Sequence, residues 1–266
     1  MQRLKHKVAL VMGAGSAGPG WGNGKACAVQ FAREGASVAC FDLQPDAAEE
    51  TAAIIRDEGG QAIAIAGNAA VSADVAAAVQ ACLKAFGRID VLHNNVGIVI
   101  NGGVVELPEE DWDRVFDVNL KSCYLAMKHA IPPMVAQGGG AIVNVSSISS
   151  LRYLGTPYAS YYTTKAAMNH LTRVTAAEYA SRQVRVNAIL PGLMDTPMAK
   201  LSALKNHGVK PEELDDKWRE RVSRIPMGWM GDAWDVAKAA VFLASEESRF
   251  ITGVSLTVDG GMTLSS

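Results

Sequence analysis

The sequence predicts a doubly wound α/β fold, in which a parallel sheet of about seven strands carries helices on both faces. Short apolar runs of strand length alternate with amphipathic stretches of helix length along the chain. No proline- or serine-rich linker, long charge run or internal repeat divides the 266 residues. Because parallel strands need crossover connections, this alternation places helices on both sides of the sheet. We therefore expect one domain over residues 1–266.

The first half of the chain alternates regularly. The expected strands and helices are Val8–Met12, Lys25–Glu34, Ser37–Phe41, Asp46–Glu58, Ala62–Ala66, Ala73–Phe86 and Ile89–His93. The first of these helices has Ala26, Val29 and Phe31 at helical spacing and is ended by Gly35. The strand runs are short and apolar throughout, as expected of strands buried on both faces.

The second half continues the alternation with a longer interruption. Its expected elements are helix Trp112–Ala136, strand Ala141–Ser146, helix Ala159–Ser181, strand Arg185–Leu190, helix Trp234–Ser245 and strand Ser255–Val258. Residues 198–230 lie between two strands and are longer than a simple connection requires. This segment follows a strand end, where ligands bind in such folds, so it is expected to form a substrate lid.

Composition excludes several classes of protein. Hydrophobic residues make up 49% and charged residues 20% of the chain, which excludes a disordered or fibrous protein. The net charge of −2 disfavours a nucleic-acid partner. The four cysteines form no CxxC pair, and the apolar run at Val8–Met12 is too short for a signal peptide or a membrane span. We therefore expect a cytoplasmic protein with reduced thiols and no membrane association.

A glycine-rich turn joins the first expected strand to the first expected helix. Glycines let the backbone approach a pyrophosphate, whose charge is attracted by the free N–H groups of a helix N-terminus. Two assignments of the helix start compete: Gly13 to Gly18 reads as GxGxxG, whereas Gly22-Asn23-Gly24 directly precedes helical sequence. The turn therefore predicts a dinucleotide site that includes Gly13, Gly22, Asn23 and Gly24.

Asp42 ends the second expected strand, about twenty residues beyond the turn. A carboxylate at this place accepts hydrogen bonds from the adenosine ribose hydroxyls and repels a 2′-phosphate. Leu43 and Gln44 supply no cation for such a phosphate. The expected cofactor is therefore NAD rather than NADP.

Tyr161 and Lys165 are spaced i and i+4 in an expected helix, so their side chains share one face. A tyrosine hydroxyl, with a pKa near 10, cannot act as a base at neutral pH unless a nearby cation stabilises the phenolate. We therefore expect Lys165 to lower the pKa of Tyr161.

Further short motifs follow in a fixed order. They are Asn94-Asn95-Val96-Gly97, Asn119 between Val118 and Leu120, Ser146-Ser147, Pro191-Gly192 with Thr196-Pro197-Met198, and Asp259-Gly260-Gly261. Together with the glycine turn and Tyr161-x-x-x-Lys165, this order resembles the short-chain dehydrogenases/reductases across nearly the whole chain. The resemblance implies a Rossmann-like fold, hydride transfer between a nicotinamide cofactor and a secondary alcohol or ketone, and a homotetramer.

The resemblance also implies roles for single residues. Tyr161 would be the acid/base, Lys165 would lower its pKa and hold the nicotinamide ribose, and Ser147 would hydrogen-bond the substrate oxygen. Asn119 would anchor a water in the proton relay. Asn94 and Gly97 would line the adenosine side, and Thr196 would hold the carboxamide. The full expected cofactor set is Gly13, Gly22, Asn23, Gly24, Asp42, Asn68, Ala69, Asn95, Gly97, Tyr161, Lys165, Pro191, Gly192, Met194 and Thr196.

The chain departs from the family pattern at three places. Met12 replaces a threonine, and about five extra residues precede Gly22. Ser147 lies one residue farther from Tyr161 than usual, which leaves Ser149 as an alternative. Asn68 replaces a frequent aspartate that faces the adenine, although an amide can still donate and accept there.

Several alternatives stay open from the sequence. An enoyl-thioester reductase would use Tyr158, seven residues before Lys165. An NADPH-dependent 3-oxoacyl reductase would share the four catalytic residues and is opposed by Asp42. A non-enzymatic dinucleotide sensor would not need all four residues together. No metal is expected, because His93, His129 and His170 lack the spacing of ligands.

The expected substrate is a small organic molecule with apolar surface. Methionine and tryptophan residues in and before the lid supply adaptable apolar contacts; they are Met194, Met198, Trp218, Met227, Trp229 and Met230. Charged residues such as Lys205, Glu212, Asp216 and Arg219 suit a solvated outer face of the lid.

Overall fold

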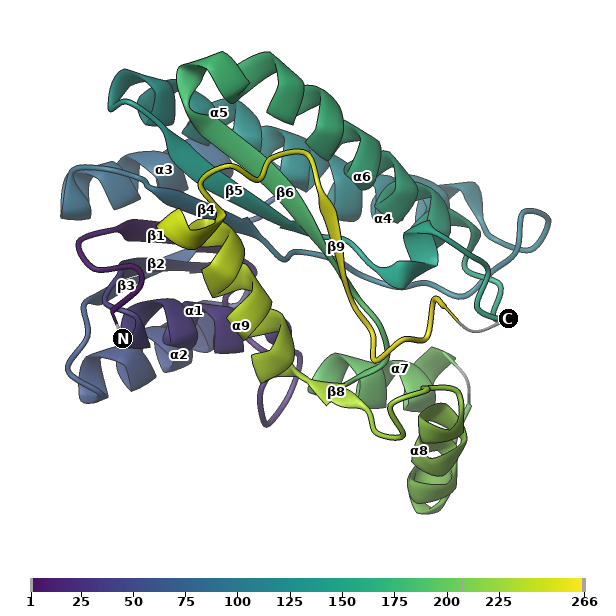
Figure 1. The fold of residues 1–266 in the computed structure, drawn as a ribbon. Helices are drawn as coiled ribbons and strands as arrows, with labels where there is room; N and C mark the ends of the chain where they lie inside the picture. Colours follow the sequence, from purple (N-terminus) through teal and green to yellow (C-terminus); the bar gives the residue numbers. More distant parts are fainter. Residues whose placement is uncertain (1, 207, 265–266) are drawn as a thin grey trace.

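A seven-stranded parallel sheet forms the centre of the computed structural model, which describes residues 2–206 and 208–264 (Figure 1). Its strands are β1 (Val8–Met12), β2 (Ser37–Asp42), β3 (Ala62–Ala66), β4 (Val91–Asn94), β5 (Gly140–Val145), β6 (Val184–Pro191) and β9 (Ser255–Val258). Their spatial order is β3-β2-β1-β4-β5-β6-β9, and every pair is parallel. The predicted doubly wound sheet is confirmed.

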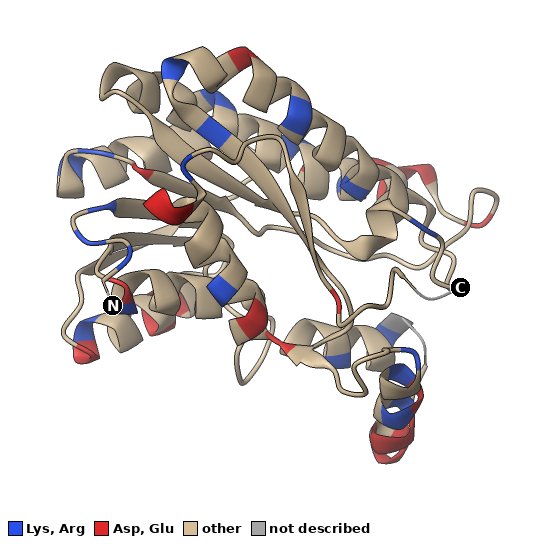
Figure 2. Ribbon diagram, viewed as in Figure 1, with Lys and Arg blue, Asp and Glu red and all other residues tan. Residues whose placement is uncertain are grey.

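Helices cover both faces of the sheet (Figure 1). On one face lie α1 (Asn23–Arg33), α2 (Pro45–Asp57) and α9 (Ala233–Ala244); on the other lie α3 (Ser72–Phe86), α4 (Glu109–Phe116), α5 (Ser122–Ala136) and α6 (Ala159–Tyr179). Alternate residues of β1 enter opposite cores: Ala9 and Val11 pack with the first layer, Leu10 and Met12 with the second. Burial on both faces explains why the strands are apolar without alternation. Figure 2 shows the charged residues mainly on the helices and loops around this sheet.

The structure differs from the sequence prediction in two places. The helix expected over Trp112–Ala136 is α4 and α5 joined by a π-helical turn, Asp117–Lys121. Two unpredicted strands, β7 (Met194–Asp195) and β8 (Gly231–Asp232), pair in parallel and bring the two ends of the lid segment together. Strands of two residues contain too few positions for a sequence period to show.

The lid segment itself carries two helices, α7 (Pro197–Asn206) and α8 (Leu214–Ser223). They lie beyond the carboxyl ends of the strands, which is the edge of the sheet where the glycine turn follows β1 (Figure 1). The strand order reverses at β1, because β2 and β4 pair with it on opposite sides. Ligands bind in the crevice at such a switch point. Among the described residues, no helix is long and apolar enough to cross a membrane.

Candidate active site

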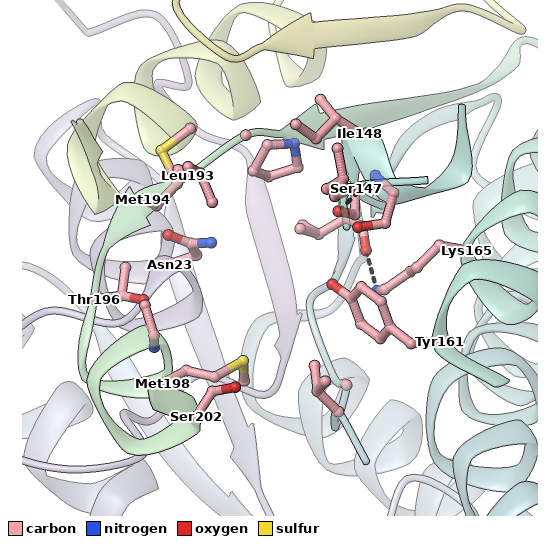
Figure 3. A pocket seen from close by; sticks show the side chains of 18 of the residues that line it. Asn23, Ser147, Ile148, Tyr161, Lys165, Leu193, Met194, Thr196, Met198 and Ser202 are labelled. Carbon is pink, nitrogen blue, oxygen red and sulfur yellow. Dashed lines mark hydrogen bonds between the residues drawn. The ribbon is translucent and has the colours of Figure 1, made fainter. Parts of the chain in front are cut away.

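A cavity of about 280 Å³ opens at the carboxyl ends of the strands, between the glycine turn, α6 and the lid helices (Figure 3). Most of the residues expected from the sequence line it: Gly22, Asn23, Asn95, Gly97, Ser147, Tyr161, Lys165, Pro191, Gly192, Met194 and Thr196. These residues come from turns after four strands and from α1 and α6. The fold therefore gathers side chains that are far apart in the sequence.

Helix α1 begins at Asn23, directly after Gly22. This start agrees with the assignment of Gly22-Asn23-Gly24 to the helix N-terminus. A Cβ on Gly24 would lie 1.8 Å from the Gly13 carbonyl oxygen, so only glycine fits where the helix crosses the turn. The Asn95 side chain donates to the same oxygen at 3.0 Å. Gly13 and Gly24 thus hold the turn against the helix and lie behind the cavity wall.

The polar groups of the turn fit a pyrophosphate. The Ser16 hydroxyl is buried, has no hydrogen-bond partner among the described residues and can donate to a phosphate oxygen. Gly22 gives α1 no side-chain cap, which leaves the first N–H groups of the helix free to bind an anion. Gly15, Ser16 and Ala17 line the cavity beside them. The sequence analysis overlooked Ser16, although it lies inside the GxGxxG pattern.

Asp42 contacts the glycine turn directly. Its Oδ2 accepts a hydrogen bond from the Gly15 N–H at 2.9 Å, and its Oδ1 accepts one from the Gln44 N–H at 3.1 Å. A Cβ on Gly15 would lie 2.9 Å from Oδ2, so glycine permits this close approach. Asn68 is exposed and its Oδ1 accepts from the Ala70 N–H at 2.9 Å, while Ala69 is buried in the core.

Tyr161, Ser147 and Lys165 meet at one wall of the cavity (Figure 3). Helix α6 places Lys165 one turn after Tyr161, with Nζ 5.6 Å from the centre of the Tyr161 ring. The Ser147 hydroxyl lies beside the Tyr161 hydroxyl and lowers its pKa. Ser147 Oγ also accepts from the Ser149 N–H at 3.1 Å. Ser147, and not Ser149, therefore faces the tyrosine hydroxyl.

Burial shifts the pKa values of Tyr161 and Lys165. It raises the pKa of the Tyr161 hydroxyl, and the Ser147 hydroxyl beside it opposes this rise. Burial also lowers the pKa of the Lys165 ammonium to about 8, and Nζ donates to the Val145 carbonyl at 2.8 Å. The groups that shift the pKa of Tyr161 in this structure are its buried surroundings, Ser147, Tyr158 and Tyr162. That Lys165 lowers this pKa stays a prediction.

Asn119 lies in the π-helical turn and is fully buried. Its Nδ2 donates to the Ile98 carbonyl at 2.9 Å, and its Oδ1 accepts from the Ile98 N–H at 2.7 Å. Both ends of the amide thus fix the chain after β4, where Gly97 lines the cavity. Asn94 also points into the core, where its Nδ2 donates to Asn144 Oδ1 at 2.8 Å. Neither residue lines the cavity.

Comparison with known proteins identifies the family. A family described as enoyl-(acyl carrier protein) reductase matches residues 18–263. A crystal structure of a short-chain dehydrogenase/reductase from Burkholderia xenovorans is 44% identical, has a TM-score of 0.92 and covers 99% of both chains. The chain belongs to the short-chain dehydrogenase/reductase family.

Two further relatives are dehydrogenases whose names state the compounds they act on or bind. A 2,5-dichloro-2,5-cyclohexadiene-1,4-diol dehydrogenase from Sphingobium indicum is 39% identical over 98% of each chain. A 7α-hydroxysteroid dehydrogenase, solved with NADH and 7-oxo glycochenodeoxycholic acid, is 31% identical with a TM-score of 0.87, and the match covers 98% of this chain and 95% of that one. Family membership and these relatives make the chain an oxidoreductase that acts at an alcohol or ketone.

A second tyrosine of this dehydrogenase/reductase lies in the same cavity. Tyr158 precedes α6, and its ring centre is 6.4 Å from that of Tyr161. Its hydroxyl is hydrogen-bonded to Ser202 of α7, whereas the Tyr161 hydroxyl faces Ser147. Tyr158 thus faces the lid, and this geometry favours Tyr161 for proton transfer.

The lid contributes residues that the sequence analysis did not assign to the site. Met194 and Met198 line the cavity as expected, but Met227 and Trp229 are exposed. Unpredicted lining residues come from both lid helices: Ala199, Ser202, Lys217, Arg221 and Arg224. Helix α8 has no fully buried residue, and its apolar residues Leu214, Trp218 and Val222 are spaced at i, i+4 and i+8. This spacing does not indicate that the neighbouring cations Lys217 and Arg221 line the cavity.

Proposed function

We propose that this oxidoreductase transfers hydride between NAD(H) and a secondary alcohol or the corresponding ketone, with Tyr161 as the proton-transferring residue. The Ser147 hydroxyl beside the Tyr161 hydroxyl, with Lys165 one helical turn away, carries the proposal. Turnover of a panel of secondary alcohols with NAD, followed as NADH absorbance, tests it. A panel of enoyl thioesters with NADH and 3-oxoacyl thioesters with NADPH tests the two alternative reactions.

Each of four residues in and behind the cavity wall has its own role in the proposed reaction. Ser147 holds the substrate oxygen, and the Tyr161 hydroxyl exchanges a proton with that oxygen at hydrogen-bonding distance. Lys165 supplies positive charge beneath the tyrosine ring, and Asn119 positions the adjoining backbone through Ile98. The bound nicotinamide supplies the hydride acceptor or donor.

The expected cofactor residues that line the cavity fit an extended dinucleotide. The start of α1, with the Ser16 hydroxyl, suits the pyrophosphate because its uncapped N–H groups and this hydroxyl can donate to phosphate oxygens. Thr196 and the Pro191–Gly192 turn suit the nicotinamide end, beside Tyr161 and Lys165. Asp42 suits the adenosine ribose.

We predict that NAD is preferred over NADP at least tenfold in kcat/KM. Asp42 lies against the glycine turn, where its carboxylate would accept from a ribose hydroxyl and repel a 2′-phosphate. Loss of one such contact costs about 1–3 kcal/mol. Steady-state kinetics with both cofactors and one substrate provides the measurement.

The substitution Asp42→Asn is expected to reduce the ratio of kcat/KM with NAD to that with NADP. The amide oxygen can still accept from the Gly15 N–H, but the negative charge that repels a 2′-phosphate is removed. Asp46→Asn, on the first turn of α2, is the matched control and should leave the preference unchanged. Equal or better kcat/KM with NADP in the unaltered protein would contradict the assignment.

We propose that residues 198–230 act as a lid that closes over bound substrate. Helix α8 buries no residue, so opening this segment exposes little apolar surface and costs little free energy. Limited proteolysis should therefore cut between residues 199 and 218 in the protein alone, and NADH with a ketone should suppress the cuts. Position 207 in this range lies outside the described residues. Equal cleavage with and without ligands would argue against closure.

A homo-oligomer, with four subunits as the resemblance implies, is part of the proposal. Fully exposed apolar side chains at Val104, Val105 and Phe250 support a contact between subunits. Light scattering coupled to size-exclusion chromatography measures the assembly, and a monomer would refute it.

A further inference from the structure

The charges that line the cavity are all of one sign. Lys165, Lys217, Arg221 and Arg224 are among its lining residues, and no aspartate or glutamate of the described chain is. The protein as a whole carries a net charge of −2, so this excess is local. Lys165 belongs to the reaction centre, whereas the other three cations come from α8 and the residue after it. Their role is not explained by the transfer of hydride and proton.

The nearest acidic groups are already paired with lysines. Glu220 lies 2.5 Å from Lys217, and Asp195 lies 3.2 Å from Lys200. Within residues 2–206 and 208–264, Arg221 has no ion pair within 4 Å. Its positive charge is therefore uncompensated by direct contact at the cavity wall.

Arg221 is held in a partly dehydrated place. Its guanidinium lies over the ring of Trp218, 4.7 Å from the ring centre, and burial lowers its pKa. Arg224 is oriented by donation to the Leu154 carbonyl at 2.8 Å. A half-buried guanidinium that stacks on an aromatic ring is pre-organised to bind an anion, because it has little conformational freedom left to lose.

The position of these cations points to the substrate and not to the cofactor. Arg221 acts electrostatically on Tyr158, and Arg224 contacts Leu154, so both lie by the loop that precedes α6. The pyrophosphate groups would lie at the start of α1, across the cavity. In Figure 2 the acidic residues of α8 gather at its far tip, while basic residues lie nearer the body of the molecule.

We propose that the natural substrate is an organic anion, a secondary alcohol or ketone with a carboxylate, sulfonate or phosphate group that Arg221 binds, with Arg224 and Lys217 beside it. This inference rests on the proposed function and names its substrate class. The body of the substrate is apolar, because Ile148, Leu154, Leu193 and Met198 line the same cavity. Such a charge-assisted contact discriminates strongly between an acid and its neutral ester.

The test compares charged and neutral compounds of the same size. Racemic 3-hydroxyhexanoate, methyl 3-hydroxyhexanoate and 2-hexanol are oxidised with NAD by the unaltered protein and by Arg221→Met. We expect kcat/KM for the acid to fall tenfold to a hundredfold in the variant, mainly through KM, while the values for ester and alcohol change less than twofold. Arg219→Met is the matched control, since Arg219 lies on the same helix, is exposed and pairs with Asp216.

A binding measurement makes the test independent of turnover. Hexanoate and hexanamide are titrated calorimetrically into protein saturated with NADH. Hexanoate should bind at least tenfold more tightly than the amide, and Arg221→Met should remove the difference without changing the affinity for NADH. Loss of NADH affinity in Arg221→Met would show instead that the cation serves the cofactor.

The outcomes separate the two proposals. If ester and alcohol are oxidised as well as the acid, and hexanoate has no advantage over hexanamide, the anion inference is overturned and the proposed function stands. If none of the three compounds is oxidised but hexanoate binding depends on Arg221, the anion site stands and the proposed reaction fails.

Discussion

Replacement of Tyr161 by phenylalanine is expected to lower kcat at least a thousandfold while the dissociation constant for NADH changes less than threefold. The substitution removes only the hydroxyl that faces Ser147, and it keeps the ring that lies beside Lys165. Proton transfer by a positioned group contributes typically 10²–10⁴-fold to rate. Steady-state kinetics gives kcat, and quenching of protein fluorescence by NADH gives the dissociation constant.

Tyr158→Phe is the matched control, because it removes a hydroxyl from the same cavity that is bonded to Ser202 of the lid. It should lower kcat by less than tenfold. If this variant is the more damaged of the two, the enoyl-reductase assignment replaces the proposed one.

Burial of Tyr161 predicts how the rate of the unaltered enzyme changes with pH. Burial raises the pKa of the Tyr161 hydroxyl, so alcohol oxidation, which needs the phenolate, should become faster as pH rises. Ketone reduction needs the protonated hydroxyl and should not rise over the same range.

The substitution Lys165→Met is expected to lower kcat/KM at least a hundredfold and at the same time to stabilise the fold at pH 7. Burial lowers the pKa of Lys165 from 10.5 to about 8, which corresponds to about 3 kcal/mol against the charged form. Loss of its bond to the Val145 carbonyl offsets about 1–2 kcal/mol of this gain. A net increase of about 1–2 kcal/mol in unfolding free energy remains.

The sign of this stability effect depends on pH. Between about pH 8 and 10.5 the unfolded chain binds a proton at Lys165 that the folded chain does not, so the unaltered protein becomes more stable as pH rises through this window. The advantage of Lys165→Met should therefore be largest below pH 8 and change sign before about pH 10.5, because the unaltered protein gains about 3 kcal/mol across this window. Urea unfolding at pH 7 and pH 10 measures it. A variant less stable than the parent at pH 7 would contradict the assigned burial cost.

Lys128→Met provides a comparison for this experiment. Lys128 is an exposed residue of α5, so removing its charge should change neither stability nor activity appreciably. The contrast with Lys165 separates the effect of a buried charge from the general effect of removing a lysine.

The sequence by itself determined the sheet. Buried strands are apolar at most positions, and runs such as Val8–Met12 and Ser37–Phe41 therefore stand out without knowledge of their neighbours. The sequence also placed Tyr161 and Lys165 on one face of a helix, because spacing along a helix fixes which side chains meet. Of its two assignments for the start of the first helix, the structure agrees with Gly22-Asn23-Gly24, and α1 begins at Asn23, two residues before the expected Lys25.

Only the tertiary structure decided what depends on burial and on contacts between distant segments. The pKa of Tyr161 rises because surrounding elements exclude water, and spacing alone indicated the opposite shift. Asn119 is used to hold Ile98, and Ser147 rather than Ser149 meets the tyrosine, because loop geometry sets these distances. The cationic face of α8 was hidden for the same reason: Leu214, Trp218 and Val222 recur at helical spacing in this charged helix, but only the packing of α8 beside the cavity shows that Arg221 faces inward.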